Sequence, residues 1–132
     1  MLEKYTLDEA DFEFPKIGNL WMKRFVTAGD LSFRAGFAKL HPGDWFEDTY
    51  WYHEFFYSVG GKARFFCEGS RWDPSEKTFE ATNGDVIYIQ KGTKWKLECI
   101  SDIPYIFFYV AIPASSQGID YKIFPATKDN PV

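Results

Sequence analysis

Turn-forming residues interrupt this chain every 8–12 residues or so, and this spacing limits the possible folds more than any other feature. No segment keeps an apolar repeat of 3.6 residues over three helical turns. The segments between the turns are rich in aromatic and β-branched residues, and we predict strands at residues 21–26, 31–40, 50–59, 62–68, 77–81, 85–90, 94–100 and 105–112. Such a series predicts an all-β sandwich or barrel, but periodicity does not choose between immunoglobulin-like, lipocalin-like and jelly-roll topologies.

Glycines mark several of the turns. Gly60-Gly61 and Asn83-Gly84 are hairpin signals, and residues 41–44 (HPGD) form another turn. We expect positive φ angles at Gly61 and Gly84, and Gly92 is expected to turn the chain back into the barrel.

The 132 residues suit one domain. We divide it into an arm at residues 1–19, with one turn of helix at residues 7–12, a barrel at about 20–114 and an irregular tail at 115–132.

The bulk properties exclude several functions. The net charge is −4 and the sequence has no basic patch, so we expect neither nucleic-acid binding nor attachment to an anionic membrane. No apolar run is long enough to span a bilayer, and the N-terminus does not read as a signal peptide. We therefore expect a cytoplasmic protein with Cys67 and Cys99 as reduced thiols.

Aromatic residues make up 20% of the chain, more than a small core requires. Some of them are therefore expected to line a cavity or an interface. Together with the N-terminal arm, this surplus leads us to expect a homodimer.

Two segments resemble the motifs of a known superfamily. YWYHEFFYSVGGK, at residues 50–62, resembles the first cupin motif, which ends in Glu, six residues and Gly, here Glu54 and Gly61. GDVIYIQKGTKWKLEC, at residues 84–99, resembles the second motif, G-x5-P-x-G-x2-H-x3-N. Its glycines fall on Gly84 and Gly92, whereas Gln90 replaces Pro, Trp95 replaces His and Cys99 replaces Asn.

The flanking segments RAGFAKLHPGDW and FFYVAIPAS resemble the EutQ-like, ethanolamine-utilization branch of the cupins. This resemblance implies a double-stranded β-helix, that is a jelly-roll barrel, with a ligand cavity inside. In the family, such barrels are often dimeric.

The resemblance also places the metal ligands of cupins, and none of those positions is histidine here. The first two fall on Asp48 and Tyr50, or on Glu47 and Thr49 with a longer spacing, and the third falls on Trp95. His53 precedes Glu54 and should point away from the barrel, because neighbours on a strand face opposite sides. We expect no metal and no cofactor, although acidic ligands (Asp48, Glu54 and Glu47) would suit a hard ion.

Glu54 is the strongest catalytic candidate. A carboxylate inside an aromatic barrel is desolvated, which raises its pKa and suits it to proton transfer. Tyr50 and Tyr52 could stabilise an oxyanion, and Asp48 could be a second carboxylate near the barrel mouth. A structural ion pair of Glu54 with Arg34 or with a lysine, or a simple turn at Asp48, would also explain these residues.

A second group of residues would bind a substrate. We expect walls for a flat or apolar molecule from Trp51, Phe56, Trp95 and Tyr109, although Trp95 would equally serve as core. Arg34 could pair with a carboxylate or phosphate of the ligand.

Three functions remain open at this point. The first is a small-molecule enzyme with metal-independent acid/base catalysis, of the isomerase, lyase, dehydratase or cyclase type. The second is a metal-dependent cupin with acidic ligands. The third is a binding or accessory protein without catalysis, and the fold alone does not decide among them.

Overall fold

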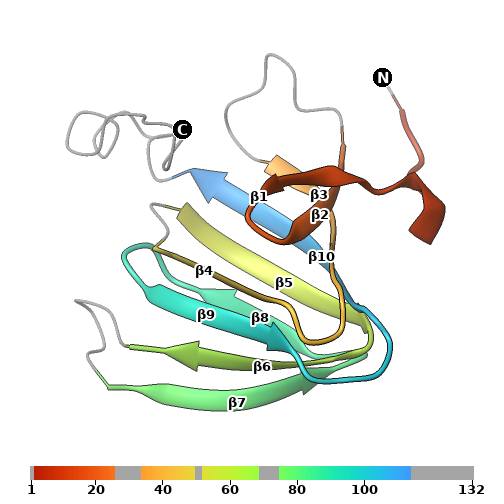
Figure 1. The fold of residues 1–132 in the computed structure, drawn as a ribbon. Helices are drawn as coiled ribbons and strands as arrows, with labels where there is room; N and C mark the ends of the chain where they lie inside the picture. Colours follow the sequence, from red (N-terminus) through yellow and green to blue (C-terminus); the bar gives the residue numbers. More distant parts are fainter. Residues whose placement is uncertain (1, 26–33, 50–51, 69–74, 114–132) are drawn as a thin grey trace.

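The computed structural model describes residues 2–25, 34–49, 52–68 and 75–113, which form two antiparallel β-sheets (Figure 1). A short 3-10 helix, η1 (Glu9–Asp11), precedes the strands. The described strands are β1 (Glu13–Ile17), β2 (Leu20–Arg24), β3 (Arg34–Leu40), β4 (Trp45–Thr49), β5 (Tyr52–Gly60), β6 (Lys62–Cys67), β7 (Lys77–Thr82), β8 (Val86–Ile89), β9 (Lys94–Cys99) and β10 (Tyr105–Pro113).

The strand order is that of two facing sheets joined by crossovers. The six-stranded sheet has the order β1-β2-β3-β10-β5-β8, and the four-stranded sheet has the order β4-β9-β6-β7. Some strands that follow one another in the chain, such as β4 and β5, therefore lie in different sheets. The all-β jelly-roll expected from the sequence is confirmed.

Two strands were not predicted. β1 lies inside the segment assigned to the arm and pairs with β2, with Glu13 opposite Met22. β4 lies in a stretch that was interpreted as a connection, and it pairs along its whole length with β9. Neither segment has a clear apolar alternation. Both are edge strands, which are held in place by the hydrogen bonds of the neighbouring strand rather than by local propensity.

Alternate residues of the strands face inward and form one hydrophobic core. Its centre is aromatic: the Phe56 and Phe107 ring centroids lie 4.3 Å apart, and the Phe56 and Trp95 centroids lie 5.5 Å apart. Residues with less than 2% exposure include Phe56, Phe107, Leu97 and Tyr105. Each fully buried side chain of this size contributes about 1.5–3 kcal/mol to folding.

One polar pair lies within this core. The hydroxyl groups of Ser58 and Tyr105 are 2.7 Å apart, and neither residue is exposed to solvent. Burial raises the pKa of Tyr105 to about 12, the hydrogen bond to Ser58 opposes this rise, and the charge of Asp85 adds to it. The pair satisfies two hydroxyl groups that would otherwise be costly to bury.

The glycines expected to have positive φ angles do have them. The φ angle is +72° at Gly61 and +96° at Gly84, and Gly92, which was expected only to turn the chain, also has a positive φ of +83°. Gly61 is also constrained by packing, since a Cβ atom there would lie 2.3 Å from the carbonyl oxygen of Pro104.

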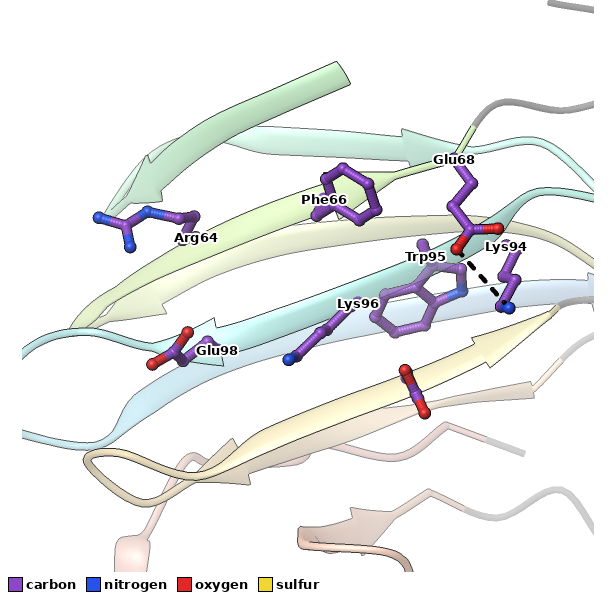
Figure 2. A pocket seen from close by; sticks show the side chains of 8 residues that line it. Arg64, Phe66, Glu68, Lys94, Trp95, Lys96 and Glu98 are labelled. Carbon is purple, nitrogen blue, oxygen red and sulfur yellow. Dashed lines mark ion pairs between the residues drawn. The ribbon is translucent and has the colours of Figure 1, made fainter. Parts of the chain in front are cut away.

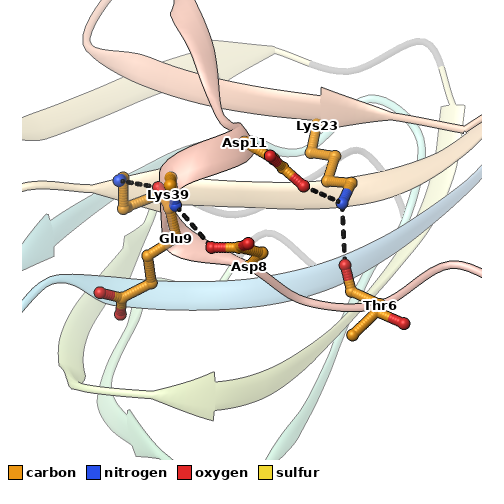
Figure 3. A network of polar contacts seen from close by, with 7 residues as sticks. Thr6, Asp8, Glu9, Asp11, Lys23 and Lys39 are labelled. Atoms are coloured by element: carbon orange, nitrogen blue, oxygen red, sulfur yellow. Dashed lines mark hydrogen bonds and ion pairs between the residues drawn. The ribbon is translucent and has the colours of Figure 1, made fainter.

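The N-terminal arm packs against the outward faces of β2 and β3 (Figure 3). Lys23 Nζ donates to the carbonyl of Thr6 at 2.8 Å and lies 3.0 Å from an oxygen of Asp11. Lys39 Nζ donates to the carbonyl of Glu9 at 3.1 Å. The expected turn of helix appears as η1, whose first turn is capped by the Asp8 carboxylate.

The two cysteines and the lack of a long apolar helix in the described part of the chain agree with the sequence. Both Cys67 and Cys99 are thiols, the first half-buried and the second buried. Within the described ranges, no helix is long and apolar enough to cross a membrane.

Candidate functional site

Glu54 is a buried acidic residue near the start of β5. It is 4% exposed, whereas the neighbouring Phe55 is 45% exposed. This alternation places Glu54 on the inward face of the six-stranded sheet, together with Phe56. The predicted orientation of these two side chains is therefore confirmed.

Arg34 lies on the same face, two strands away. Ala111 of β10 pairs with Arg34 of β3 on one side and with Glu54 of β5 on the other. Strand spacing puts the backbones of Arg34 and Glu54 about 10 Å apart. Between them on this face lies only the methyl side chain of Ala111.

Tyr109 adds a phenol to this group. It is 8% exposed and lies two residues before Ala111, hence on the same face. Burial raises the pKa of Tyr109 to about 12; the charges of Arg24 and Arg34 oppose the rise and that of Glu54 adds to it. Tyr109 is therefore neutral near pH 7, and its hydroxyl can donate a hydrogen bond.

Gly36 creates the space for the Tyr109 hydroxyl. A Cβ atom on Gly36 would lie 2.8 Å from that hydroxyl and 2.6 Å from the carbonyl oxygen of Lys23. Gly36 pairs with both Tyr109 and Arg24. Neither Gly36 nor Arg24 could be assigned to the site from the sequence, because only the pairing of β2 with β3 brings them beside Tyr109.

Trp95 and Asp48 approach the same end of the barrel from the opposite sheet. Asp48 at the end of β4 pairs with Trp95 near the start of β9. Trp95 is 3% exposed, and its ring contacts those of Phe46 and Phe56, with centroids 5.6 and 5.5 Å apart. Asp48 is half-buried in a strand, so the alternative of a simple turn at Asp48 is wrong.

Three other candidates cannot be placed. Tyr50 and Trp51 lie outside the described residues, and Tyr52 begins β5 with a side chain that also lies outside the described part. Their assignment to the site stays a prediction.

The acidic metal ligands considered above are not all brought together. Glu47 is exposed and lies on the opposite face of β4 from Asp48. Among the described residues, no three His, Cys, Asp or Glu side chains come close enough to hold a metal ion.

His53 points away from Glu54, as the alternation predicts. Its ring stacks on that of Tyr88 with centroids 6.3 Å apart, and its Nδ1 lies 3.1 Å from the Tyr88 hydroxyl. The backbone NH of Lys91 also donates to this nitrogen, at 3.4 Å.

An open groove of about 470 Å³ lies on the outward face of the four-stranded sheet (Figure 2). Its charges alternate in sign, and Lys94 Nζ lies 3.6 Å from a carboxylate oxygen of Glu68. The lining residues are Glu47, Arg64, Phe66, Glu68, Lys94, Trp95, Lys96 and Glu98. Of the residues predicted to act on or bind a substrate, Trp95 alone lines this groove, together with Glu47, which was considered as a metal ligand, so the groove is distinct from the Glu54 group.

Comparison with known proteins identifies the fold. No protein-family model and no curated protein matches the sequence. Among solved structures, the Cnp3 cupin domain of Schizosaccharomyces pombe has a TM-score of 0.72 at 14% identity, over 90% of this chain and 80% of that chain.

Two further solved structures share this fold. An ethanolamine utilization protein, EutQ, from Salmonella typhimurium is 29% identical over 72% of this chain and 70% of its own, with a TM-score of 0.57. The oxalate decarboxylase of Lactobacillus farciminis, solved as a formate complex, has a TM-score of 0.63 at 20% identity, over 79% of this chain and 32% of that chain. The cupin resemblance and its EutQ-like character are thus confirmed.

Proposed function

We propose that this chain, which has the cupin fold and resembles EutQ, is a small-molecule enzyme that works by metal-independent proton transfer. Glu54 is the proposed acid/base, in a reaction of the isomerase, lyase, dehydratase or cyclase type. The observation that carries the proposal is the position of the Glu54 carboxylate. It is 4% exposed and lies on the same inward face as the neutral phenol of Tyr109 and the guanidinium of Arg34. The fold occurs in an oxalate decarboxylase, but one fold hosts many activities.

Each polar group has a distinct role in this proposal. Glu54 moves a proton to or from a carbon atom of the substrate. The neutral Tyr109 donates a hydrogen bond to the oxygen on which negative charge develops. Arg34 binds an acidic group of the substrate, and Asp48, from the opposite sheet, is a second carboxylate.

The ring systems suggest the shape of the substrate. Phe56 and Trp95 contact one another at the level of Glu54 and Asp48. A molecule with a flat or apolar part and one carboxylate would meet rings on one side and Arg34 on the other. We include a homodimer and a cytoplasmic location in this proposal, on the aromatic content and the charge described above.

Exchange with heavy water tests the role of Glu54. Wild-type protein is incubated in D₂O with a panel of small aryl- and alkyl-substituted carboxylic acids, and deuterium on carbon is followed by mass spectrometry. Glu54→Gln should reduce the exchange rate about 10²–10⁴-fold, the usual contribution of a general acid/base. Unchanged exchange in this variant contradicts the proposal.

Glu47→Gln is the matched control, because Glu47 is an exposed carboxylate on the opposite face of β4. The Glu47→Gln variant should catalyse deuterium exchange as fast as the wild type. A compound that binds but never exchanges in any variant would favour the non-catalytic alternative.

A further inference from the structure

A second arginine lies on the sheet face that carries Glu54. Arg24 is the last residue of β2 and pairs with Gly36 of β3, which in turn pairs with Tyr109 of β10. Residues that pair across an antiparallel sheet point to the same face, so Arg24 shares the inward face with Tyr109. Because the strand order is β2-β3-β10-β5, Arg24 and Glu54 lie on opposite sides of this phenol (Figure 1).

The alternation along β2 supports this orientation and places Arg24 at the mouth of the barrel. Leu20 and Met22 are 4% and 7% exposed and belong to the hydrophobic core. Arg24 is the next residue on the same face, and it is exposed. The core of this strand therefore ends at Met22, and a guanidinium that water can reach follows it.

Gly36 leaves open space between Arg24 and Tyr109. The Tyr109 hydroxyl lies 2.8 Å from the position that a Cβ atom on Gly36 would take, so this side chain extends over β3 in the direction of β2. Burial raises the pKa of Tyr109 to about 12, and the charges of Arg24 and Arg34 oppose this rise. Both guanidiniums therefore act on the same hydroxyl.

Arg24 and Arg34 are diagonal neighbours on adjacent strands. Arg24 pairs with Gly36, and Arg34 precedes Gly36 by two residues on the same face of β3. Diagonal neighbours of this kind are about 7–8 Å apart, a distance that two long side chains can span. Two positive charges at this spacing repel one another, and an anion bound between them removes that cost.

The inward carboxylate of the six-stranded sheet lies closer to Arg34 than to Arg24. Glu54 and Arg34 both pair with Ala111, whereas Arg24 lies three strands away from Glu54. Arg24 forms no ion pair with any carboxylate in the part of the chain that the structure describes. Its positive charge is therefore available to an acidic group of a ligand.

We propose that Arg24 is a second anchor for the substrate, and that the site selects small molecules with two negative charges. One arginine fork matches one carboxylate. Two neighbouring forks match either two carboxylates or one phosphate, which carries about −1.5 to −2 charges near pH 7. The inference rests on the proposed function, because it concerns the same site, and it names the substrate class as a dianion with a flat or apolar part.

Isothermal titration calorimetry of the full chain with three probes tests this anchor. Phenylsuccinate has two carboxylates, phenyl phosphate has one dianionic group, and benzoate has a single carboxylate. The wild type should bind at least one of the two dianions about tenfold or more tightly than benzoate, the usual effect of an added hydrogen bond to a charged group. The dianion that binds more tightly shows whether the second charge belongs to a carboxylate or to a phosphate.

Arg24→Gln should abolish the preference for dianions and leave the affinity for benzoate within about twofold, because Arg34 remains. Arg24 is exposed, so the variant should fold. Arg24→Lys keeps the charge without the planar fork, and its affinity for dianions should lie between those of Arg24→Gln and the wild type. Arg24→Lys also replaces Arg24→Gln in the test if the glutamine variant does not fold.

Arg64→Gln is the matched control. It removes the same charge from the outward face of β6, where the Arg64 side chain is 51% exposed and lies 3.6 Å from a carboxylate oxygen of Glu80. Its preference for dianions should equal that of the wild type. An equal loss in Arg64→Gln and Arg24→Gln would mean that only net charge matters, and this result overturns the inference.

Two other results overturn it as well. One is a wild type that binds both dianions no more tightly than benzoate, and the other is wild-type affinity for dianions in the folded Arg24 variants. The Glu54 proposal is decided separately, by deuterium exchange. Dianion binding that depends on Arg24 but leads to no exchange contradicts catalysis and keeps the anchor, whereas exchange without a preference for dianions does the reverse.

Discussion

Glycine 36 shows how a residue without a side chain shapes the candidate site. The Tyr109 hydroxyl occupies the volume that a Cβ atom would need, and the Lys23 carbonyl lies on the same side. A phenol is thereby accommodated next to the sheet and close to the charges of Arg24, Glu54 and Arg34.

Gly36→Ala should therefore destabilise the protein by about 1–3 kcal/mol, the usual cost of overpacking. Gly60→Ala is the control, because a Cβ atom there meets no atom within 4 Å and its φ is not positive. Urea denaturation measures the free energy of unfolding of both variants. Equal stability of Gly36→Ala and the wild type would show that the Lys23 backbone and the tyrosine both move aside without cost.

At the scale of elements, the arm matters because it decides which part of a sheet stays exposed. Lys39 is 8% exposed, and its ammonium group lies 4.7 Å from the Phe12 ring centroid. With the carbonyl of Glu9 as its acceptor, this lysine fastens the arm to β3.

Lys39→Met keeps the apolar stem and removes the charged donor. A hydrogen bond from a charged group contributes about 1.5–3 kcal/mol, so amide exchange at residues 9–12 should accelerate about tenfold or more. Lys62→Met is the control, since Lys62 is 45% exposed and pairs with Glu80 on β6 and β7. Unchanged exchange in Lys39→Met would mean that ring contacts alone hold the arm.

At the scale of the whole molecule, two buried phenols couple folding to alkaline pH. The pKa values of Tyr105 and Tyr109 are raised to about 12, against about 10 in an unfolded chain. Above pH 10 the unfolded chain loses these protons while the folded chain keeps them. The free energy of unfolding therefore falls between about pH 10 and 12, and the contribution of these two groups is complete below pH 10.

The free energy of unfolding should fall by up to about 2–3 kcal/mol for each phenol. Urea denaturation at intervals from about pH 9.5 to 11.5 should show it. Tyr109→Phe should show a smaller fall over the same range, which separates this phenol from the lysines that titrate there. An identical pH dependence in the variant and the wild type would contradict the assignment.

The local sequence determined much of the strand set and its turns. Apolar alternation between turn residues identified β5, β6, β8, β9 and β10 to within a few residues, because alternation follows directly from the pleat of a strand. The positive φ angles of Gly61 and Gly84 could also be predicted from the local turn sequence. Strand alternation likewise assigned Glu54 and Phe56 to one face before the strand pairing was known.

Only the tertiary structure decided the rest. β1 and β4 exist because neighbouring strands complete their hydrogen bonds. Tyr109, Arg24 and Gly36 come together through strand pairing that spans 85 residues of chain, and local patterns carry no register over such a separation. The strand spacing predicted an all-β fold, and the resemblance to the cupin motifs selected a jelly-roll barrel with an acidic residue facing inward. Packing of the arm on β2 and β3 covered part of the outward face of the six-stranded sheet, whereas the aromatic side chains of β5 and β8 on that face stayed exposed.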